Sequence, residues 1–181
     1  MIVSLMLEGM PSRLSFKDLL LIKLTKEDTI MGIWDNIKNT TSEWSSSLQT
    51  KAKQFQNEKF ADASMAICAL VAAADGNVDA DERSKTASLI INNDALDCFD
   101  AEDLKDRFNK FCDKLDSDFD FGKIALLQTI GKVRGKDSEA RALIQIGIII
   151  GGADGHFDPD EKKVVADSCR ALGLNPTEFD L

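Results

Sequence analysis

The chain has 181 residues, of which 44% are hydrophobic, so it is long enough for one domain with a buried core. Its 31 Asp and Glu residues outnumber its 22 Lys and Arg residues, which gives a net charge of −9. This balance argues against a nucleic-acid-binding protein, which needs a basic face, and against an enzyme that concentrates anions. It suits a cation or a basic partner.

The N-terminal part differs from the rest of the chain. Residues 1–30 show no clear helical face and no signal-peptide cleavage site, so we expect an upstream extension of uncertain order, with the native start at Met31. Residues 31–56 are predicted to form an amphipathic helix and a polar connector. The helix has one apolar face, with Ile33, Trp34 and Ile37. It packs on the body of the protein or, alternatively, binds a membrane surface or a partner.

Apolar residues recur at helical spacing from about Lys51 to the end of the chain, and no stretch alternates as a strand does. One predicted helical face carries Phe60, Ser64, Ile67 and Val71, and another carries Leu104, Phe108, Phe111 and Leu115. Six helices are predicted, over residues 51–76, 79–92, 101–115, 119–133, 138–153 and 158–173, before a last turn at Asn175-Pro176. We therefore expect an all-α fold, a compact bundle of about six to seven helices, with the helical domain over residues 57–181.

A short acidic stretch occurs twice. AAADGNVDADER, from Ala72 to Arg83, returns in large part as GADGHFDPDEKK, from Gly152 to Lys163. Four positions keep one offset of 79 residues: Asp75 with Asp154, Gly76 with Gly155, Asp79 with Asp158, and Glu82 with Glu161. The repeat predicts two similar turns between helices.

Helix capping explains most of this repeat. The pattern D-x-x-E, at Asp79 and again at Asp158, is a capping box, in which the Asp side chain caps the helix and the Glu side chain reaches back to the cap amide. Pro159 suits the first helical position, and acids in a first turn suit the helix dipole. The two glycines are predicted to end the preceding helices. None of these features needs a ligand.

Asp75 and Asp154 do not fit that explanation. Each is predicted at the C-terminal end of a helix, where an exposed carboxylate meets the negative end of the dipole at a cost of about 0.3–1 kcal/mol. The pattern D-G-x-Φ-D-x-x-E, with Φ apolar, also matches the second half of an EF-hand loop. The opening acids of that loop are missing in both copies, so neither copy should bind calcium in the EF-hand manner.

A metal site shared by the two copies would repair that deficit. The predicted helices end in small residues, Ala72-Ala73-Ala74 and Gly151-Gly152-Ala153, which would let their backbones approach closely. If these ends meet, six carboxylates converge: Asp75, Asp79, Glu82, Asp154, Asp158 and Glu161. All of these donors are oxygens, which favours Ca²⁺, Mg²⁺ or Mn²⁺ over zinc or copper. The alternative is two capped helices on a solvated acidic face.

A third acidic stretch, LDSDFDFGK over residues 115–123, is less specific. Asp116, Asp118 and Asp120 alternate as in the opening of an EF-hand loop, but Leu127 stands where the closing Glu belongs. We expect an inter-helix loop with an Asp cap.

Several functional classes lack their signatures in this sequence. There is no Ser-His-Asp arrangement, P-loop or dinucleotide fingerprint, and no apolar run is long enough for a membrane span. The four cysteines form no CxxC pair, which indicates reduced, mostly buried thiols in a cytoplasmic protein. They are Cys68, Cys98, Cys112 and Cys169.

The paired motifs AAADGNVDADE and GGADGHFDPDEK resemble those of the TerB family of tellurite-resistance proteins, as do the MGIWDNIK opening, the FDFGK segment and the closing ALGLNPTEFDL. The resemblance covers Met31 to Leu181. It implies an all-helical fold of two pseudo-repeated halves and a role in the ter stress system, in resistance to tellurite and to insults such as phage or colicins. It also implies a scaffold that binds divalent metal, above all Ca²⁺, through the six carboxylates named above. Such a scaffold works in the cytoplasm, or peripherally at the inner face of the membrane, beside the membrane-integral partner TerC.

Three functions compete. The first is a metal-binding interaction module, which is not an enzyme. The second is an enzyme, either a metal-assisted hydrolase or a cysteine reductant. No base, arginine clamp or phosphate loop supports it, and only Arg107 and Lys110 bring basic company to a cysteine, Cys112. The third is a metal-free adaptor whose acidic face docks a basic partner.

Overall fold

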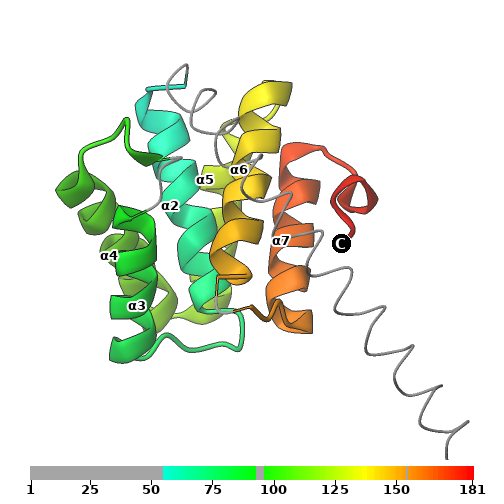
Figure 1. The fold of residues 1–181 in the computed structure, drawn as a ribbon. Helices are drawn as coiled ribbons and strands as arrows, with labels where there is room; N and C mark the ends of the chain where they lie inside the picture. The colour runs from blue at the N-terminus through cyan, green and yellow to red at the C-terminus, as the bar shows by residue number, and fades with distance from the viewer. Residues whose placement is uncertain (1–54, 93–95, 154) are drawn as a thin grey trace, which may run out of the picture. The chain divides into compact units, whose positions relative to one another are not determined.

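The structure, a computed structural model, describes residues 55–92, 96–153 and 155–181 (Figure 1). All of them fall in the unit that spans Glu43–Leu181. The predicted extension over residues 1–30 lies outside the described residues, and so does most of the predicted helix and connector over residues 31–56.

Six α-helices and one short 3₁₀ helix make up the described residues, which contain no strand. They are α2 (Glu58–Ala72), α3 (Ala80–Ile91), α4 (Ala101–Ser117), α5 (Phe119–Gly131), α6 (Asp137–Gly151), α7 (Pro159–Leu172) and η2 (Pro176–Phe179). The predicted all-α bundle is therefore confirmed, and each predicted helix corresponds to an observed one.

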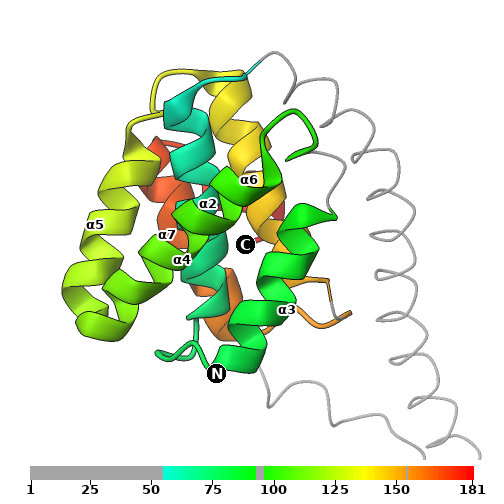
Figure 2. The ribbon, with the colours of Figure 1, turned by 90° about the vertical axis from the view of Figure 1, so that its left-hand side faces the viewer.

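Helix α2 lies at the centre of the bundle, and α4, α5, α6 and α7 pack around it (Figures 1 and 2). Every side chain from Phe60 to Val71 is buried except that of Asp62. The sequence pattern predicted one buried face only. The small Ala and Ser side chains between the larger ones let neighbouring helices approach α2 from several directions, which is why the burial extends around it.

The outer helices are amphipathic to different degrees. The apolar stripe predicted for α4 is buried, namely Leu104, Phe108, Phe111 and Leu115, together with Cys112. Helix α3 buries only Thr86 and Ile90. It therefore contributes little to the core and packs mainly against α4.

The helices that precede the two acidic turns end earlier than the sequence predicted. Helix α2 ends at Ala72 rather than at Gly76, and α6 ends at Gly151 rather than at Ala153. In both cases the chain leaves the helix in a short turn before the glycine of the acidic motif is reached.

The helices form two repeated halves, α2 with α3 and α6 with α7. The starts of α2 and α6, their ends, and the starts of α3 and α7 all keep the offset of 79 residues. The repeat seen in twelve residues of sequence thus extends over two whole helix–turn–helix units, which confirms the expected pseudo-repeat.

Helices α2 and α6 pack closely because glycines of α6 leave notches for apolar side chains of α2. A Cβ on Gly147 would lie 2.7 Å from Cδ1 of Ile67, and a Cβ on Gly151 would lie 3.3 Å from Cγ1 of Val71. The two contacts advance in the same direction along both helices, so the helices run parallel (Figure 1). The turns that follow them therefore leave the same end of the bundle.

Candidate functional site

The same backbone hydrogen bond occurs within each of the two acidic turns. The N–H of Gly76 donates to the carbonyl of Ala73 over 2.9 Å, and the N–H of Gly155 donates to the carbonyl of Gly152 over 3.0 Å. Both motif glycines have positive φ, +99° and +90°, in the left-handed region that glycine adopts readily. The sequence had suggested that these glycines end the preceding helices. In the structure the helices end earlier, and the glycines shape the turns that follow.

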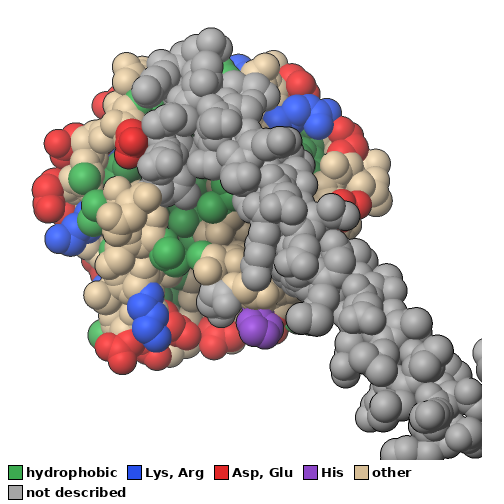
Figure 3. Space-filling model, viewed as in Figure 1, with side chains coloured by type: hydrophobic (Ala, Val, Ile, Leu, Met, Phe, Trp, Pro, Cys, Tyr) green, Lys and Arg blue, Asp and Glu red, His purple; other side chains and the backbone are tan. Residues whose placement is uncertain are grey.

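The apolar residue of the repeated motif anchors each turn to the core. Val78 is buried in the first turn. Phe157, its counterpart, packs over Gly151, where a Cβ would lie 2.7 Å from Cε2 of the ring. Each turn is therefore anchored to the core, and Asp75, Asp79 and Asp158 are exposed at this end of the bundle. This end is the lower edge of the molecule in Figure 3, along which Asp and Glu side chains gather.

Both predicted capping boxes are present. Oδ1 of Asp79 accepts from the N–H groups of Asp81 and Glu82, each over 2.8 Å, and Oε2 of Glu82 accepts from the N–H of Asp79 over 3.1 Å. Asp158 and Glu161 repeat these bonds at the start of α7 over 2.8 to 2.9 Å. One oxygen of each carboxylate is therefore committed to its own helix.

Asp75 has a structural role that the sequence interpretation missed. Its Oδ1 accepts from the N–H of Asn77 over 3.1 Å, the hydrogen bond of an Asx-turn. It also stands beyond the end of α2 at Ala72, so the expected conflict with the C-terminal helix dipole does not arise. Its counterpart Asp154 lies outside the described residues.

Five of the six predicted metal ligands are described. Four of them form the predicted capping boxes, namely Asp79, Glu82, Asp158 and Glu161, whereas Asp75 lies in the turn after α2 rather than at the end of the helix. Among the described residues, no group of three or more His, Cys, Asp or Glu side chains is placed to hold a metal ion. The donor set nevertheless suits a hard cation chemically, because carboxylate oxygens are the ligands that Ca²⁺ and Mg²⁺ prefer. The cap bonds at Asp79 and Asp158 use Oδ1 and leave Oδ2 outside the cap.

The third acidic stretch has the expected Asp cap, but it is not a loop: α4 ends at Ser117 and α5 begins at Phe119, so only Asp118 lies between the two helices. Oδ1 of Asp118 accepts from the N–H of Phe121 at the start of α5 over 3.1 Å. Asp116 lies 3.9 Å from Nη2 of Arg83 on α3. These acids therefore connect helices.

The thiols have the burial expected of structural cysteines. Cys68, Cys112 and Cys169 are buried and Cys98 is half-buried. Burial raises the pKa of Cys68 well above its ordinary value, and raises the pKa of Cys169 to about 11. Burial also raises the pKa of Cys112, although the guanidinium of Arg83 opposes this shift. The basic neighbour of Cys112 thus comes from another helix rather than from the adjacent sequence.

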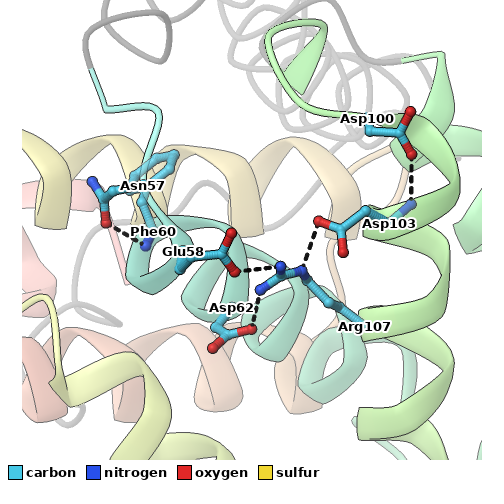
Figure 4. Close-up of polar contacts among 7 residues, drawn as sticks. All are labelled: Asn57, Glu58, Phe60, Asp62, Asp100, Asp103 and Arg107. Carbon is cyan, nitrogen blue, oxygen red and sulfur yellow. Dashed lines mark hydrogen bonds and ion pairs between the residues drawn. The ribbon is translucent and has the colours of Figure 1, made fainter.

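Arg107 of α4 binds three carboxylates, and two of them, Glu58 and Asp62, are on α2, so the arginine joins the two helices (Figure 4). Its Nε donates to Asp103 over 2.8 Å, its Nη1 donates to Asp62 over 2.6 Å, and its Nη2 donates to Glu58. Sequence analysis missed this network. The one signal available was Asp62, the only acid within the apolar run of α2.

No helix among the described ranges is both long enough and apolar enough to cross a membrane.

Comparison with known proteins supports the resemblance from residue 61 onwards, whereas the sequence motifs had suggested that it begins at Met31. The profile of the family described as tellurite resistance protein TerB matches residues 61–181. One curated relative, the tellurium resistance protein TerB of Alcaligenes sp, is 25% identical over 118 residues, which are 65% of this chain and 97% of the relative. No solved structure matches the chain.

Proposed function

The chain belongs to the TerB family of tellurite resistance proteins, and from this premise we propose that it is a non-enzymatic interaction module whose two acidic turns bind a divalent cation. The proposed cation is Ca²⁺, with Mg²⁺ and Mn²⁺ as the alternatives. The proposed ligands are Asp75, Asp79, Glu82, Asp154, Asp158 and Glu161.

One observation carries the proposal: two turns of the same geometry leave the same end of a parallel, closely packed helix pair. The notches at Gly147 and Gly151 hold that pair together. Phe157 packs on Gly151 in the second turn, and Val78 is buried in the first. Neither turn has the ligands of a complete EF-hand loop, so a cation would need carboxylates from both. A cation bound there would offset charge in a chain of net −9 and would link the two halves.

The absence of an enzymatic role is part of the proposal. A cysteine reductant needs an exposed thiol with a lowered pKa, whereas burial raises the pKa of Cys68, Cys112 and Cys169. The acidic end also suits a basic protein partner better than an anionic substrate. We infer that such a partner is a membrane-bound protein of the TerC type, met in the cytoplasm at the inner face of the membrane.

A second candidate, a metal-free acidic adaptor, is favoured by the cap bonds. Asp75, Asp79 and Asp158 each accept backbone hydrogen bonds within their own turn. Those bonds explain the repeated acids without a cation, and the acidic end would then dock its partner directly.

Calorimetry of the full chain separates these two functions. Ca²⁺ and Mg²⁺ are titrated into the wild type and into the double variant Asp75→Asn, Asp154→Asn, which loses one proposed ligand charge from each turn. A matched control carries Asp81→Asn and Asp160→Asn, because these exposed first-turn acids are outside the proposed ligand set.

We expect saturable Ca²⁺ binding by the wild type and the control, and its loss in the ligand variant. Equal binding by all three proteins would remove these acids from the site. An absence of binding to the wild type would refute the cation and leave the adaptor, whose basic partner would then be sought by pull-down with the acidic end altered.

A further inference from the structure

Helices α2, α4 and α5 pack on one another at one side of the bundle (Figure 2), and their side chains line a polar groove. Its volume is about 550 Å³, within the range of small-molecule sites. Asp62 of α2, Arg107 and Lys110 of α4 and Thr129 of α5 line it, with Phe111 as a largely buried apolar wall.

Three residues of the groove lining are already joined in ion pairs. Arg107 binds Asp62 and Asp103 of the lining as well as Glu58 outside it (Figure 4). Five guanidinium N–H groups in a fixed fork suit this multiple pairing. Arg107 and two lining carboxylates are thus engaged with one another.

The remaining cations of the lining have no such partners. Lys110 and Lys114 stand one turn apart on α4, and Lys132 follows the end of α5. Within the described ranges, ion pairs of lysines occur at Lys105, Lys123 and Lys136 only. The ammonium of Lys114 instead lies 5.6 Å from the centre of the Phe111 ring.

The charge of the groove contrasts with that of the chain. Four cations and three carboxylates line it, so the lining carries one net positive charge. Glu58, paired with Arg107 from outside, brings the sum to zero, whereas the whole chain carries −9. Because Asp62 and Asp103 pair with Arg107, Asp106 is the one other carboxylate of the lining that can offset the charge of the three lysines.

We propose that this groove binds a small phosphate-bearing anion through Lys110, Lys114 and Lys132. Three ammonium groups around a concave wall provide charge-assisted hydrogen bonds to several anionic oxygens at once. Lys is a common phosphate-binding residue because its three donors turn freely on a flexible stem. The proposal does not depend on the cation site, since that site lies in the turns after α2 and α6.

Two of the three lysines could instead serve only to stabilise the C-terminal ends of helices. Lys114 is in the last turn of α4 and Lys132 caps the C-terminus of α5, where cations suit the helix dipole. This role does not extend to Lys110, which lies further from the end of α4. It also predicts no ligand, so binding measurements distinguish the two roles.

The test is calorimetry of the full chain with inorganic phosphate and inorganic pyrophosphate in metal-free buffer. The groove variant carries Lys110→Gln, Lys114→Gln and Lys132→Gln. The control carries Lys59→Gln, Lys85→Gln and Lys163→Gln, three exposed lysines outside the groove, so both variants lose the same charge. Thermal unfolding checks that both are folded.

We expect the wild type and the control to bind pyrophosphate more tightly than phosphate, and the groove variant to bind it at least about tenfold more weakly. Equal affinities in the groove variant and the control would overturn the proposal. Sedimentation with phosphatidylcholine vesicles, with and without phosphatidylglycerol, distinguishes a lipid headgroup from a soluble ligand. Binding to the anionic vesicles alone, lost in the groove variant, assigns the phosphate to lipid. Failure to bind either the soluble probes or the vesicles refutes the site.

Discussion

Ile67 of α2 fills the notch at Gly147 of α6, with its Cδ1 2.7 Å from the position that a Cβ on the glycine would take. Ile67 is fully buried, so its side chain has little room in which to move away. This contact holds together the first helices of the two repeated halves, and with them the ends from which both acidic turns leave.

The substitution Gly147→Ala should therefore destabilise the protein although alanine favours helices. Overpacking a well-filled core costs about 1–3 kcal/mol, which exceeds the gain of up to about 1 kcal/mol from replacing a helical glycine. We expect a lower free energy of unfolding in urea. Gly131→Ala is the control, because the nearest atom to its added Cβ is 3.7 Å away. A Gly147→Ala protein as stable as this control would show that α2 and α6 do not pack in this way.

The conformation of the acidic turns predicts the response of Gly76. Its φ is +99° with open space around it, so alanine would be disfavoured by the backbone alone, by about 1–2 kcal/mol. Asparagine tolerates positive φ better and should cost less. Urea unfolding of Gly76→Ala and Gly76→Asn measures both. Equal stabilities of the two variants would argue against a left-handed residue in this turn.

Capping and cation binding by Asp79 and Asp158 can be separated by the choice of substitution. Asn caps a helix about as well as Asp, whereas Ala at this position costs about 0.5–2 kcal/mol. In the presence of a chelator, the variants with Asn should unfold like the wild type and those with Ala should be less stable. If a cation binds, added Ca²⁺ should stabilise the wild type more than the Asn variants. Identical stabilisation of all of them would place any bound Ca²⁺ elsewhere.

Loss of Arg107 should loosen α4 from α2. The guanidinium is the most buried partner of its network, and its acids are more exposed, so screening limits the loss for Arg107→Gln to about 1–2 kcal/mol. Arg107→Lys should recover little of it, because one ammonium cannot bind three carboxylates in that geometry. The control Lys105→Gln breaks an exposed pair at 3.8 Å and should cost less than about 0.5 kcal/mol. Urea unfolding at low and high salt measures all three, and a loss no greater than that of the control would contradict the network.

The buried thiols predict how stability depends on alkaline pH. The pKa of Cys169 is raised from 9.0 to about 11 by burial, so the unfolded chain releases this proton at lower pH than the folded protein does. The free energy of unfolding should therefore fall as pH rises from 9 towards 11. The free energy of unfolding of the Cys169→Ala variant should fall less steeply over this range than that of the wild type.

The burial of three thiols also predicts the order in which they react. At pH 8 a thiol reagent should modify half-buried Cys98 first, and the buried thiols only on unfolding. Rapid modification of all four would contradict their burial.

Local features of the chain were predicted well because they depend on neighbouring residues. Asp79 and Asp158 cap their helices through the amides two and three residues ahead, and Asn175 and Pro176 begin the last turn as expected. The ends of α2 and α6 were predicted less well. The chain turns at Ala73 and Gly152, before the glycines that marked these ends in the sequence.

The candidate sites were predictable only in part. The acids of the repeated turns could be named from the spacing of the repeat. Their place at one end of the bundle follows from Gly147, which carries no signal in the sequence because its role depends on Ile67, 80 residues earlier. The Asx-turn at Asp75 was missed because an alternative explanation, a bound cation, accounted for the same residue.

The all-α class, the helices, both capping boxes and the repeat could all be predicted from the order of the residues, since they depend on spacing over a few residues and on one exact offset. Tertiary packing set which faces of α2 are buried, that α2 and α6 run parallel, and that Arg107 binds Glu58 and Asp62. The fold also places Lys132, the residue after α5, in the lining of the same groove as Lys110 of α4. Such placements depend on how side chains of distant segments fit against one another, and net charge and periodicity carry no information about that fit.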